Sequence, residues 1–284
     1  MKYNFINSHS KSSFEIIKNK KSLLIKKYPK KIDLRELSSV NKQNNFKNYI
    51  IENYLIKSSK IISKIPEIKK NKFYLLKYYS GKSGSDLLQY GNYEEISILK
   101  KFFYNYFNAN LNNKNFYYLD KDIILSKIDS IKKDIKIKEI KIIAKKIISK
   151  VQKKINKNIL YPLSNTCHGD LTLGNIIINS KNKKIILIDF QKTYHDNIVQ
   201  DLSKVFQDFK LNWTSRSFSS LDKVRSRIIY NSMINDSFWN DLNKKIKKSL
   251  NQEILITLLR IFPYLKKEDK ISIQWLISSF NKLI

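Results

Sequence analysis

The sequence predicts an α+β protein with two lobes: a small β-rich N-terminal lobe over residues 1–79 and a larger, mainly helical C-terminal lobe over residues 86–284. Short apolar runs separated by turn residues fill the first lobe, a pattern that is typical of strands. Isoleucines recur at steps of three and four residues in 120–157, which indicates amphipathic helices. Residues 80–85 read SGKSGS and hold two of the chain's five glycines, so we expect a hinge there.

The N-terminal lobe is expected to contain four strands and one helix. Residues 14–17 and 22–26 form two strands joined by a polar turn, and a helix near residues 40–55 follows them. Residues 66–68 and 72–79 form the next two strands, and the second of these leads into the hinge.

The C-terminal lobe is expected to be helical around a single hairpin. Apolar runs at 176–179 and 184–188 are the two strands, and the polar residues 180–183 between them form the turn. A helix over 198–208 follows, and four further helical stretches occupy residues 219–283, with Pro263 breaking one of them.

The most informative stretch reads HGDLTLGN from His168 to Asn175, and an Asp-Phe pair at Asp189 ends the second hairpin strand. Asp170 and Asn175 are five residues apart, which suits a single loop. Folding the hairpin makes Asn175 and Asp189 cross-strand neighbours, roughly 5 Å apart. An amide oxygen and a carboxylate at that separation can chelate one hard cation, and magnesium fits because it takes oxygen ligands and commonly bridges to phosphates.

The pattern H-x-D-x-x-x-x-N, followed by an Asp-Phe strand end and by Asp201-Leu202, resembles the aminoglycoside phosphotransferase and choline kinase branch of the protein-kinase-like superfamily. The resemblance implies a bilobal protein-kinase-like fold and an ATP-dependent enzyme that phosphorylates small molecules. It implies that Asp170 positions and deprotonates the acceptor hydroxyl, with His168 as a structural member of the catalytic loop. Asn175 and Asp189 would hold Mg²⁺ on the ATP phosphates, and Asp201 would brace the loop.

The resemblance also implies a nucleotide site in the N-terminal lobe. Lys26, at the end of an apolar strand, resembles the lysine that pairs with the α- and β-phosphates. The following helix should orient this lysine, and we align Gln43 with the usual glutamate; Glu36 and Glu52 are the other candidates.

Two further segments complete the predicted nucleotide site. Ser12 and Ser13 stand where protein kinases have phosphate-binding glycines, and they could donate to phosphate or form an ordinary polar turn. Backbone groups of Lys77, Tyr78 and Tyr79 would bond the adenine edge.

Residues after the hairpin should bind the acceptor, and Asp208, Trp213 and Arg216 could line this site. Residues 201–284 contain scattered acids but no dense cluster of the kind that a polycationic aminoglycoside needs. The basic Lys210 and Arg216 favour a neutral or anionic acceptor, such as a sugar or sugar phosphate, and an amino alcohol is the other class considered.

Composition limits the remaining alternatives. The formal net charge is +31, with 55 basic and 24 acidic residues, and lysine supplies nearly all of the basic charge along the whole chain. Such a bias is also what AT-rich codons produce, so the charge is either functional or a codon effect. No recognition motif for nucleic acid is present, and we expect no specific nucleic-acid partner.

Cys167 is the chain's one cysteine, so no intramolecular disulfide can form. No apolar run reaches membrane-span length and the N-terminus lacks a signal-peptide core, so we expect a cytoplasmic protein. Three classes remain: an active small-molecule kinase, an ATP-binding pseudokinase or scaffold without turnover, and a polyanion-binding protein.

Overall fold

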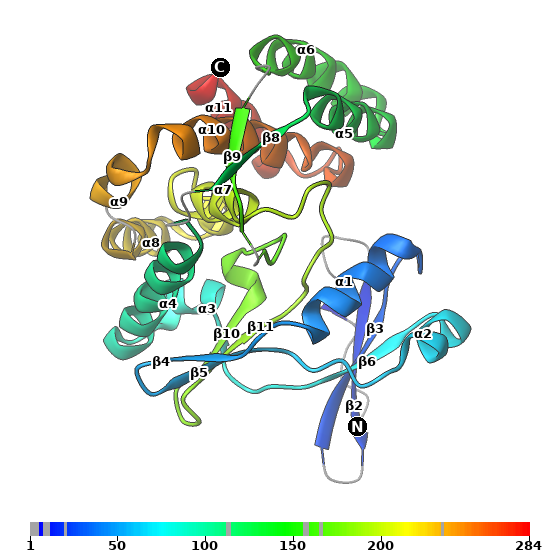
Figure 1. The fold of residues 1–284 in the computed structure, drawn as a ribbon, viewed down its shortest axis with the longest axis vertical. Coiled ribbons are helices and arrows are strands. Elements are labelled where there is room, and N and C mark those ends of the chain that lie inside the picture. The colour runs from blue at the N-terminus through cyan, green and yellow to red at the C-terminus, as the bar shows by residue number, and fades with distance from the viewer. Residues whose placement is uncertain are drawn as a thin grey trace. The chain divides into compact units, whose positions relative to one another are not determined.

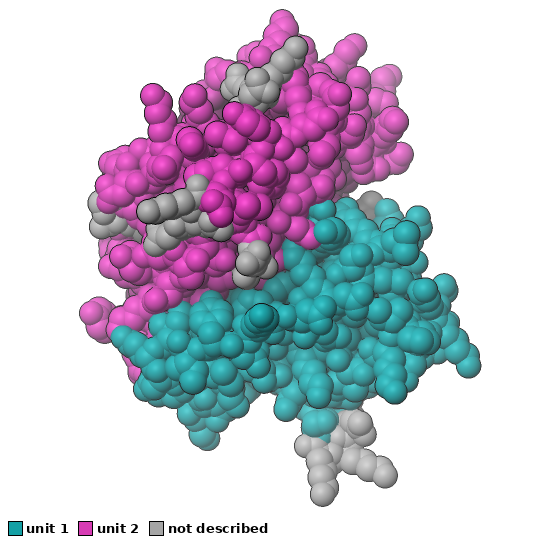
Figure 2. All heavy atoms as spheres, in the orientation of Figure 1, with its two compact units in different colours: residues 1–84, 174–193 teal, residues 85–173, 194–284 magenta. Residues whose placement is uncertain are grey.

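The computed structural model describes residues 6–7, 12–19, 22–111, 115–155, 159–164, 167–233 and 236–284. The chain divides into two compact units, which Figure 2 colours separately. Unit 1 contains residues 1–84 and 174–193, and unit 2 contains residues 85–173 and 194–284. The hairpin that we predicted within the C-terminal lobe therefore groups with the N-terminal strands in unit 1.

Unit 1 is built on two sheets (Figure 1). The first has the antiparallel order β1-β2-β3-β6, with bounds Ile6–Asn7, Ser13–Asn19, Ser22–Tyr28 and Tyr74–Lys77. The second has the order β4-β5-β11-β10-β7, with bounds Tyr49–Ile51, Tyr54–Ser58, Lys184–Leu187, Ile176–Asn179 and Lys82–Ser83. Because β11 pairs with β5 in parallel, the hairpin from the middle of the chain completes this sheet.

Helix α1 (Leu34–Asn44) begins after Asp33, whose carboxylate accepts a hydrogen bond from the amide of Glu36 at 3.0 Å. An aspartate at this position satisfies one of the amides that the first helical turn leaves unpaired. Leu37 and Val40 of α1 belong to a buried apolar cluster that also contains Tyr74 of β6. The cap and the cluster together hold the first turn of α1, and with it Glu36, in place.

Two predictions for unit 1 are wrong. Residues 66–68 lie in helix α2 (Ile65–Asn71), where Pro66 occupies the first turn and its missing N–H costs no helical bond. The helix predicted near 40–55 ends at Asn44, and β4 and β5 follow it. The hairpin strands at 176–179 and 184–187 are confirmed, with an antiparallel register that pairs Ile176 with Leu187.

Unit 2 is mainly helical. Its helices are α3 (Gly84–Tyr90, which starts on the last residue of unit 1), α4 (Tyr93–Leu111), α5 (Lys121–Asp134), α6 (Lys138–Lys154), α7 (Ile198–Phe209), α8 (Ser220–Met233), α9 (Asp236–Asp241), α10 (Lys244–Leu259) and α11 (Lys270–Leu283). Strands β8 (Phe116–Leu119) and β9 (Ile159–Pro162) form a two-stranded ribbon that the sequence had not predicted. Short 3-10 helices lie at Leu173–Asn175 (η1, which crosses the boundary between the units), Thr214–Ser217 (η2) and Phe262–Tyr264 (η3).

Helices α7 and α10 form the centre of unit 2, and nearly every residue of α7 is buried. Polar side chains on a buried helix need hydrogen-bond partners within the protein. Ser203 of α7 accordingly forms a hydrogen bond with Thr257 of α10. The mixed α+β class, with a β-rich N-terminal region and a helical C-terminal region, is confirmed. Among the described residues, no helix is long and apolar enough to cross a membrane.

Candidate active site

The loop that carries the HGD sequence is built on Asp201 of α7. The amides of His168 and Gly169 donate to the Asp201 carboxylate at 2.6 and 2.7 Å, and the Tyr106 hydroxyl donates to it at 2.7 Å. Asp201 and His168 are both fully buried, and Gly169 has a φ of 87°, a conformation that favours glycine. We call residues 168–173 the HGD loop; Asp201 satisfies two of its backbone donors at once.

Asp170 lies at the turn of the HGD loop. Its amide donates to Nδ1 of His168 at 3.2 Å, and its carboxylate forms an ion pair with Lys204 of α7, Nζ to Oδ1 2.9 Å. Burial alone would raise the pKa of Asp170, but the charges of Lys204 and Arg260 outweigh that effect and lower it. Asp170 is therefore held ionised, as a group that accepts a proton late in a reaction can be.

Both carboxylate oxygens of Asp208 accept hydrogen bonds from within unit 2. One of its oxygens accepts from the amide of Leu173 at 2.9 Å and the other from the Thr214 hydroxyl at 2.7 Å, and the side chain is buried. Burial raises its pKa to about 6, against the opposing effect of these hydrogen bonds. Asp208 thus anchors the end of the HGD loop from α7, and its predicted contact with an acceptor stays a prediction.

Trp213 and Arg216 are likewise engaged within unit 2. The Arg216 guanidinium stacks on the Trp213 ring, 3.6 Å from Cζ to the ring centroid, and donates to the Trp213 carbonyl and to the Ser272 hydroxyl at 2.8 and 2.9 Å. The indole of Trp275 donates to the Leu211 carbonyl at 2.5 Å and packs on Trp213. These contacts fasten η2 to α11, and the predicted acceptor contact of Trp213 and Arg216 stays a prediction.

In unit 1, Asn175 and Asp189 flank the ends of the hairpin strands. The amide of Ile188 donates to the carbonyl of Asn175 at 3.0 Å, which makes these two residues the opposed pair. Asp189 therefore lies one residue beyond the position directly opposite Asn175 that we had expected. Its φ of 60° turns the chain sharply where the strand ends.

The lysine beside Asp189 is Lys27, not Lys26. Its Nζ lies 2.5 Å from Oδ1 of Asp189 and 3.7 Å from Oε1 of Glu36, and its side chain is buried. Burial alone would lower its pKa, but Asp189 and the groups around it raise it above its ordinary value. Lys26 points to the other side of β3, where its Nζ lies over the rings of Phe73 and Tyr28, so the lysine that contacts Asp189 is Lys27 and not the Lys26 that we had aligned.

Glu36, which we had named as an alternative, is the acid that contacts this lysine. It also accepts a hydrogen bond from the Tyr74 hydroxyl at 2.8 Å. Gln43 is buried and its side-chain amide is bonded to the backbone: it donates to the Ser59 carbonyl at 2.7 Å and accepts from the Phe190 amide at 3.3 Å. Gln43 therefore holds the residue that follows Asp189, and Glu52 lies in the turn between β4 and β5.

The segment from Lys77 to Tyr79 has part of its backbone bonded within unit 1. The amide of Lys77 donates to the Lys60 carbonyl at 2.9 Å and the amide of Tyr78 to the Leu23 carbonyl at 3.2 Å. These two amides donate hydrogen bonds within unit 1. The predicted adenine contact would therefore have to use other backbone groups of the segment. Ser12 is buried and Ser13 begins β2, while residues 8–11 of the predicted phosphate segment lie outside the described residues.

The oxygen donors at the hairpin suit a magnesium ion that is shared with a nucleotide. No three His, Cys, Asp or Glu side chains converge among the described residues, so the donor set here is the Asp189 carboxylate with the Asn175 amide. Magnesium is commonly bound through one or two protein oxygens and completed by phosphates and water. The pair therefore fits a Mg²⁺–ATP site and does not fit a cage made by protein ligands alone.

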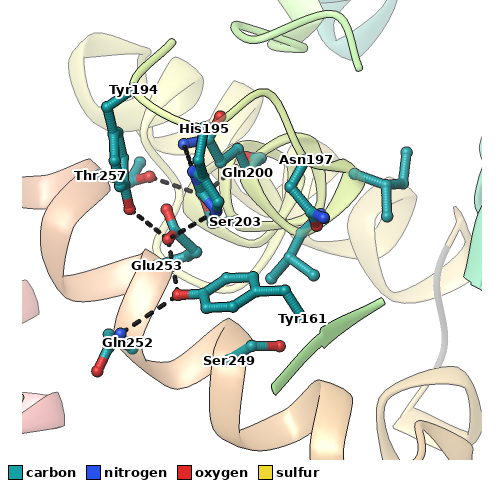
Figure 3. Close-up of polar contacts among 12 residues, drawn as sticks. Tyr161, Tyr194, His195, Asn197, Gln200, Ser203, Ser249, Gln252, Glu253 and Thr257 are labelled. Atoms are coloured by element: carbon teal, nitrogen blue, oxygen red, sulfur yellow. Dashed lines mark hydrogen bonds and ion pairs between the residues drawn. The ribbon is translucent and has the colours of Figure 1, made fainter. Parts of the chain in front are cut away.

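The segment that joins Asp189 to α7 is anchored in unit 2 by a buried carboxylate (Figure 3). Glu253 of α10 accepts hydrogen bonds from the hydroxyls of Tyr161, at 2.9 Å, and Tyr194. Nε2 of His195 lies 3.5 Å from the same oxygen, and burial lowers the pKa of this histidine. The sequence had given no signal for this cluster, whose members come from three separate elements.

Comparison with known proteins agrees with this geometry. A family model described as ecdysteroid kinase-like matches residues 85–208, which is less than half of the chain but includes Asp170, Asn175, Asp189 and Asp201. Solved structures that are similar over almost the whole chain include two kinases. An ethanolamine kinase from Plasmodium vivax has a TM-score of 0.52 at 14% identity, covering 99% of this chain and 83% of its own. The choline kinase LicA from Streptococcus pneumoniae has a TM-score of 0.50 at 13% identity, covering 95% and 89%.

At these identities the likeness establishes the fold alone, which is the one shared by these two kinase structures, as the motif predicted. A comparison with curated protein sequences finds no significant match.

Proposed function

We propose that this protein is a Mg²⁺–ATP-dependent kinase that transfers the γ-phosphate to a hydroxyl of a small-molecule acceptor, either sugar-like or an amino alcohol. The observation that carries the proposal is Lys27 held between Asp189 and Glu36. A buried lysine with two carboxylates, one of them at a hairpin end beside an asparagine, is the arrangement that orients nucleotide phosphates and their cation.

The residue roles follow from the contacts. Lys27 would bind the nucleotide phosphates, with Glu36 orienting its ammonium group, and Asn175 and Asp189 would hold Mg²⁺. When bound, the ion neutralises charge on the phosphates. Asp170 would orient the acceptor hydroxyl and take its proton, while Asp201 and Asp208 keep the HGD loop in shape. Catalysis of phosphoryl transfer rests mainly on positioning and charge stabilisation, and this set supplies both.

The test is ADP release from Mg²⁺–ATP with pooled sugars, sugar phosphates, amino alcohols and aminoglycosides. Asp170→Asn should reduce turnover by roughly 10²- to 10⁴-fold, the usual contribution of a general base. Asp129→Asn removes the same charge from an exposed position on α5 and should leave turnover unchanged. Thermal stabilisation by Mg²⁺–ATP should survive Asp170→Asn.

Two other results would redirect the proposal. Stabilisation by Mg²⁺–ATP without turnover in any pool would make the protein an ATP-binding pseudokinase or scaffold. Absence of both stabilisation and turnover would mean that the nucleotide site has been wrongly assigned, and binding of polyanions that collapses with added salt would then favour the third class.

A further inference from the structure

Helix α7 places a buried lysine against Asp170. Lys204 Nζ lies 2.9 Å from Oδ1 of Asp170, and the two side chains are only 10% and 19% exposed. Burial lowers the pKa of Lys204 and the charge of Asp170 opposes that effect. Because so little of the Lys204 side chain contacts water, solvent screens its charge poorly.

A second cation belongs to the same group. Arg260 caps the C-terminus of α10, is half-buried, and acts electrostatically on both Asp170 and Lys204. The two helices cannot slide apart freely here, because the hydroxyl of Ser203, the residue before Lys204, bonds that of Thr257 at 2.7 Å (Figure 3). Both cations are therefore held in position by the packing of α7 on α10.

The remaining titratable groups near Asp170 do not reverse this charge. His168 presents its Nδ1 to the Asp170 amide as an acceptor. Asp208, one turn further along α7, acts on Lys204, but both of its oxygens accept hydrogen bonds from the chain, from Leu173 and Thr214. A molecule that brings its hydroxyl to Asp170 consequently meets these two cations, and the Asp208 carboxylate beside them already accepts two hydrogen bonds.

We propose that Lys204 is a specificity-determining residue that restricts the acceptor to molecules that are neutral or anionic beside the reactive hydroxyl. The inference deepens the proposed kinase function and rests on it. An ammonium or quaternary amine close to that hydroxyl would be repelled by Lys204 and Arg260, and it would compete with Lys204 for the Asp170 carboxylate. A phosphate or a second hydroxyl at the same place would be attracted or tolerated.

The first arm of the test uses the unmodified protein. ADP release is measured with matched acceptors that share a skeleton and differ in charge: glucose, glucosamine and glucose 6-phosphate, and then glycerol, glycerol 3-phosphate and 3-amino-1,2-propanediol. We expect kcat/KM for the cationic member of each series to be at least tenfold below that of the best neutral or anionic member. Preference for the cationic members would overturn the inference while leaving the kinase function intact.

The second arm uses Lys204→Met, Lys204→Arg and the control Lys248→Met, which removes an exposed lysine of α10. Lys204→Met should lower kcat by about 10²-fold, as for loss of one charge-stabilising group. It should also move the acidic limb of the kcat/KM profile to higher pH and shrink the discrimination against the cationic acceptors. Lys204→Arg should keep both properties near those of the unmodified protein.

A Lys204→Met protein with an unchanged pH profile and unchanged discrimination would refute the role of this lysine. If that variant does not fold, the matched acceptors and Lys204→Arg decide the question. Absence of ADP release and of Mg²⁺–ATP stabilisation in the unmodified protein is a different result, since it removes the kinase function and the inference together.

Discussion

Asp201 should be among the most important side chains for the stability of unit 2. Its buried carboxylate accepts hydrogen bonds from the amides of His168 and Gly169 and from the Tyr106 hydroxyl. Asp201→Ala removes this shared acceptor from all three buried donors. A hydrogen bond to a charged group contributes about 1.5–3 kcal/mol, and removing one member of a buried charged network typically costs about 3–5 kcal/mol after relaxation.

We therefore expect Asp201→Ala to lower the free energy of unfolding of unit 2 by about 3–5 kcal/mol. Asp201→Asn should cost less, because one oxygen can still accept. The assay is urea unfolding followed by tryptophan fluorescence, which isolates this unit because all three tryptophans, at positions 213, 239 and 275, lie in it. Asp129→Ala, at an exposed site on α5, is the matched control and should leave the midpoint nearly unchanged.

A loss below about 1 kcal/mol for Asp201→Ala would refute this reasoning, because it would mean that water satisfies the loop amides equally well. A change in the slope of the urea transition would indicate an altered unfolded state or loss of two-state behaviour, and the comparison would then need the Asn variant.

Three further predictions concern the nucleotide lysine, the buried Asp208 and the hairpin. Lys27→Met should weaken Mg²⁺–ATP binding by about tenfold or more, equivalent to ~1.4 kcal/mol, whereas Lys26→Met should not; ligand-dependent thermal shifts would show a misassignment if the two behaved alike. Because the pKa of Asp208 is raised to about 6, the folded state holds its proton more tightly than the unfolded state. Protonated Asp208 therefore contributes about 3 kcal/mol to the free energy of unfolding, relative to its ionised form. This contribution is fully present below pH 4 and is lost as the pH rises through 6. Asp208→Asn should flatten that dependence in tryptophan-monitored unfolding, and an unaltered slope between pH 4 and 6 would contradict it. Gly81→Ala should destabilise unit 1 by about 1–3 kcal/mol, since Gly81 has a φ of +150° and a Cβ there would lie 2.5 Å from the Ile178 carbonyl oxygen; unchanged hydrogen exchange in β10 would rule this out.

Local signals were enough to predict the catalytic hairpin. Its strands and turn occupy the predicted residues because apolar runs and a polar turn stand next to each other in the sequence. The sequence signals for the start of α1 were also local, but they lie several residues before the start that we predicted. Asp33 and Glu36 form the D-x-x-E pattern of a helix start, and a prediction that began the helix near residue 40 aligned Gln43 in place of Glu36.

The choice between Lys26 and Lys27 could not be made from sequence. Adjacent residues of a strand face opposite sides, so a one-residue error in register exchanges the two lysines. In the structure Lys26 pairs across the strands with Glu15 and Lys27 with Phe14, a register set by long-range pairing with β6 as well as by the hairpin.

Lys204 carried no local signal at all. It is one of many lysines in a chain with 55 basic residues, and it follows Asp201 on a helix that reads as ordinary. Only the packing of α7 under the HGD loop brings its ammonium group to Asp170. In so basic a chain, burial and not residue type separates a functional lysine from the solvated ones.

The insertion of β10 and β11 into the sheet of unit 1 has a consequence for synthesis of the chain. One edge of β5 is paired by β4 as soon as both have been made, but the other edge waits for β11. About 125 residues separate β5 from β11, and at ribosomal speeds their translation takes on the order of 10 s. During that interval a nascent chain exposes an unpaired apolar strand edge, the kind of surface that invites aggregation. Chaperone capture of the growing chain should therefore peak between the emergence of β5 and that of β11.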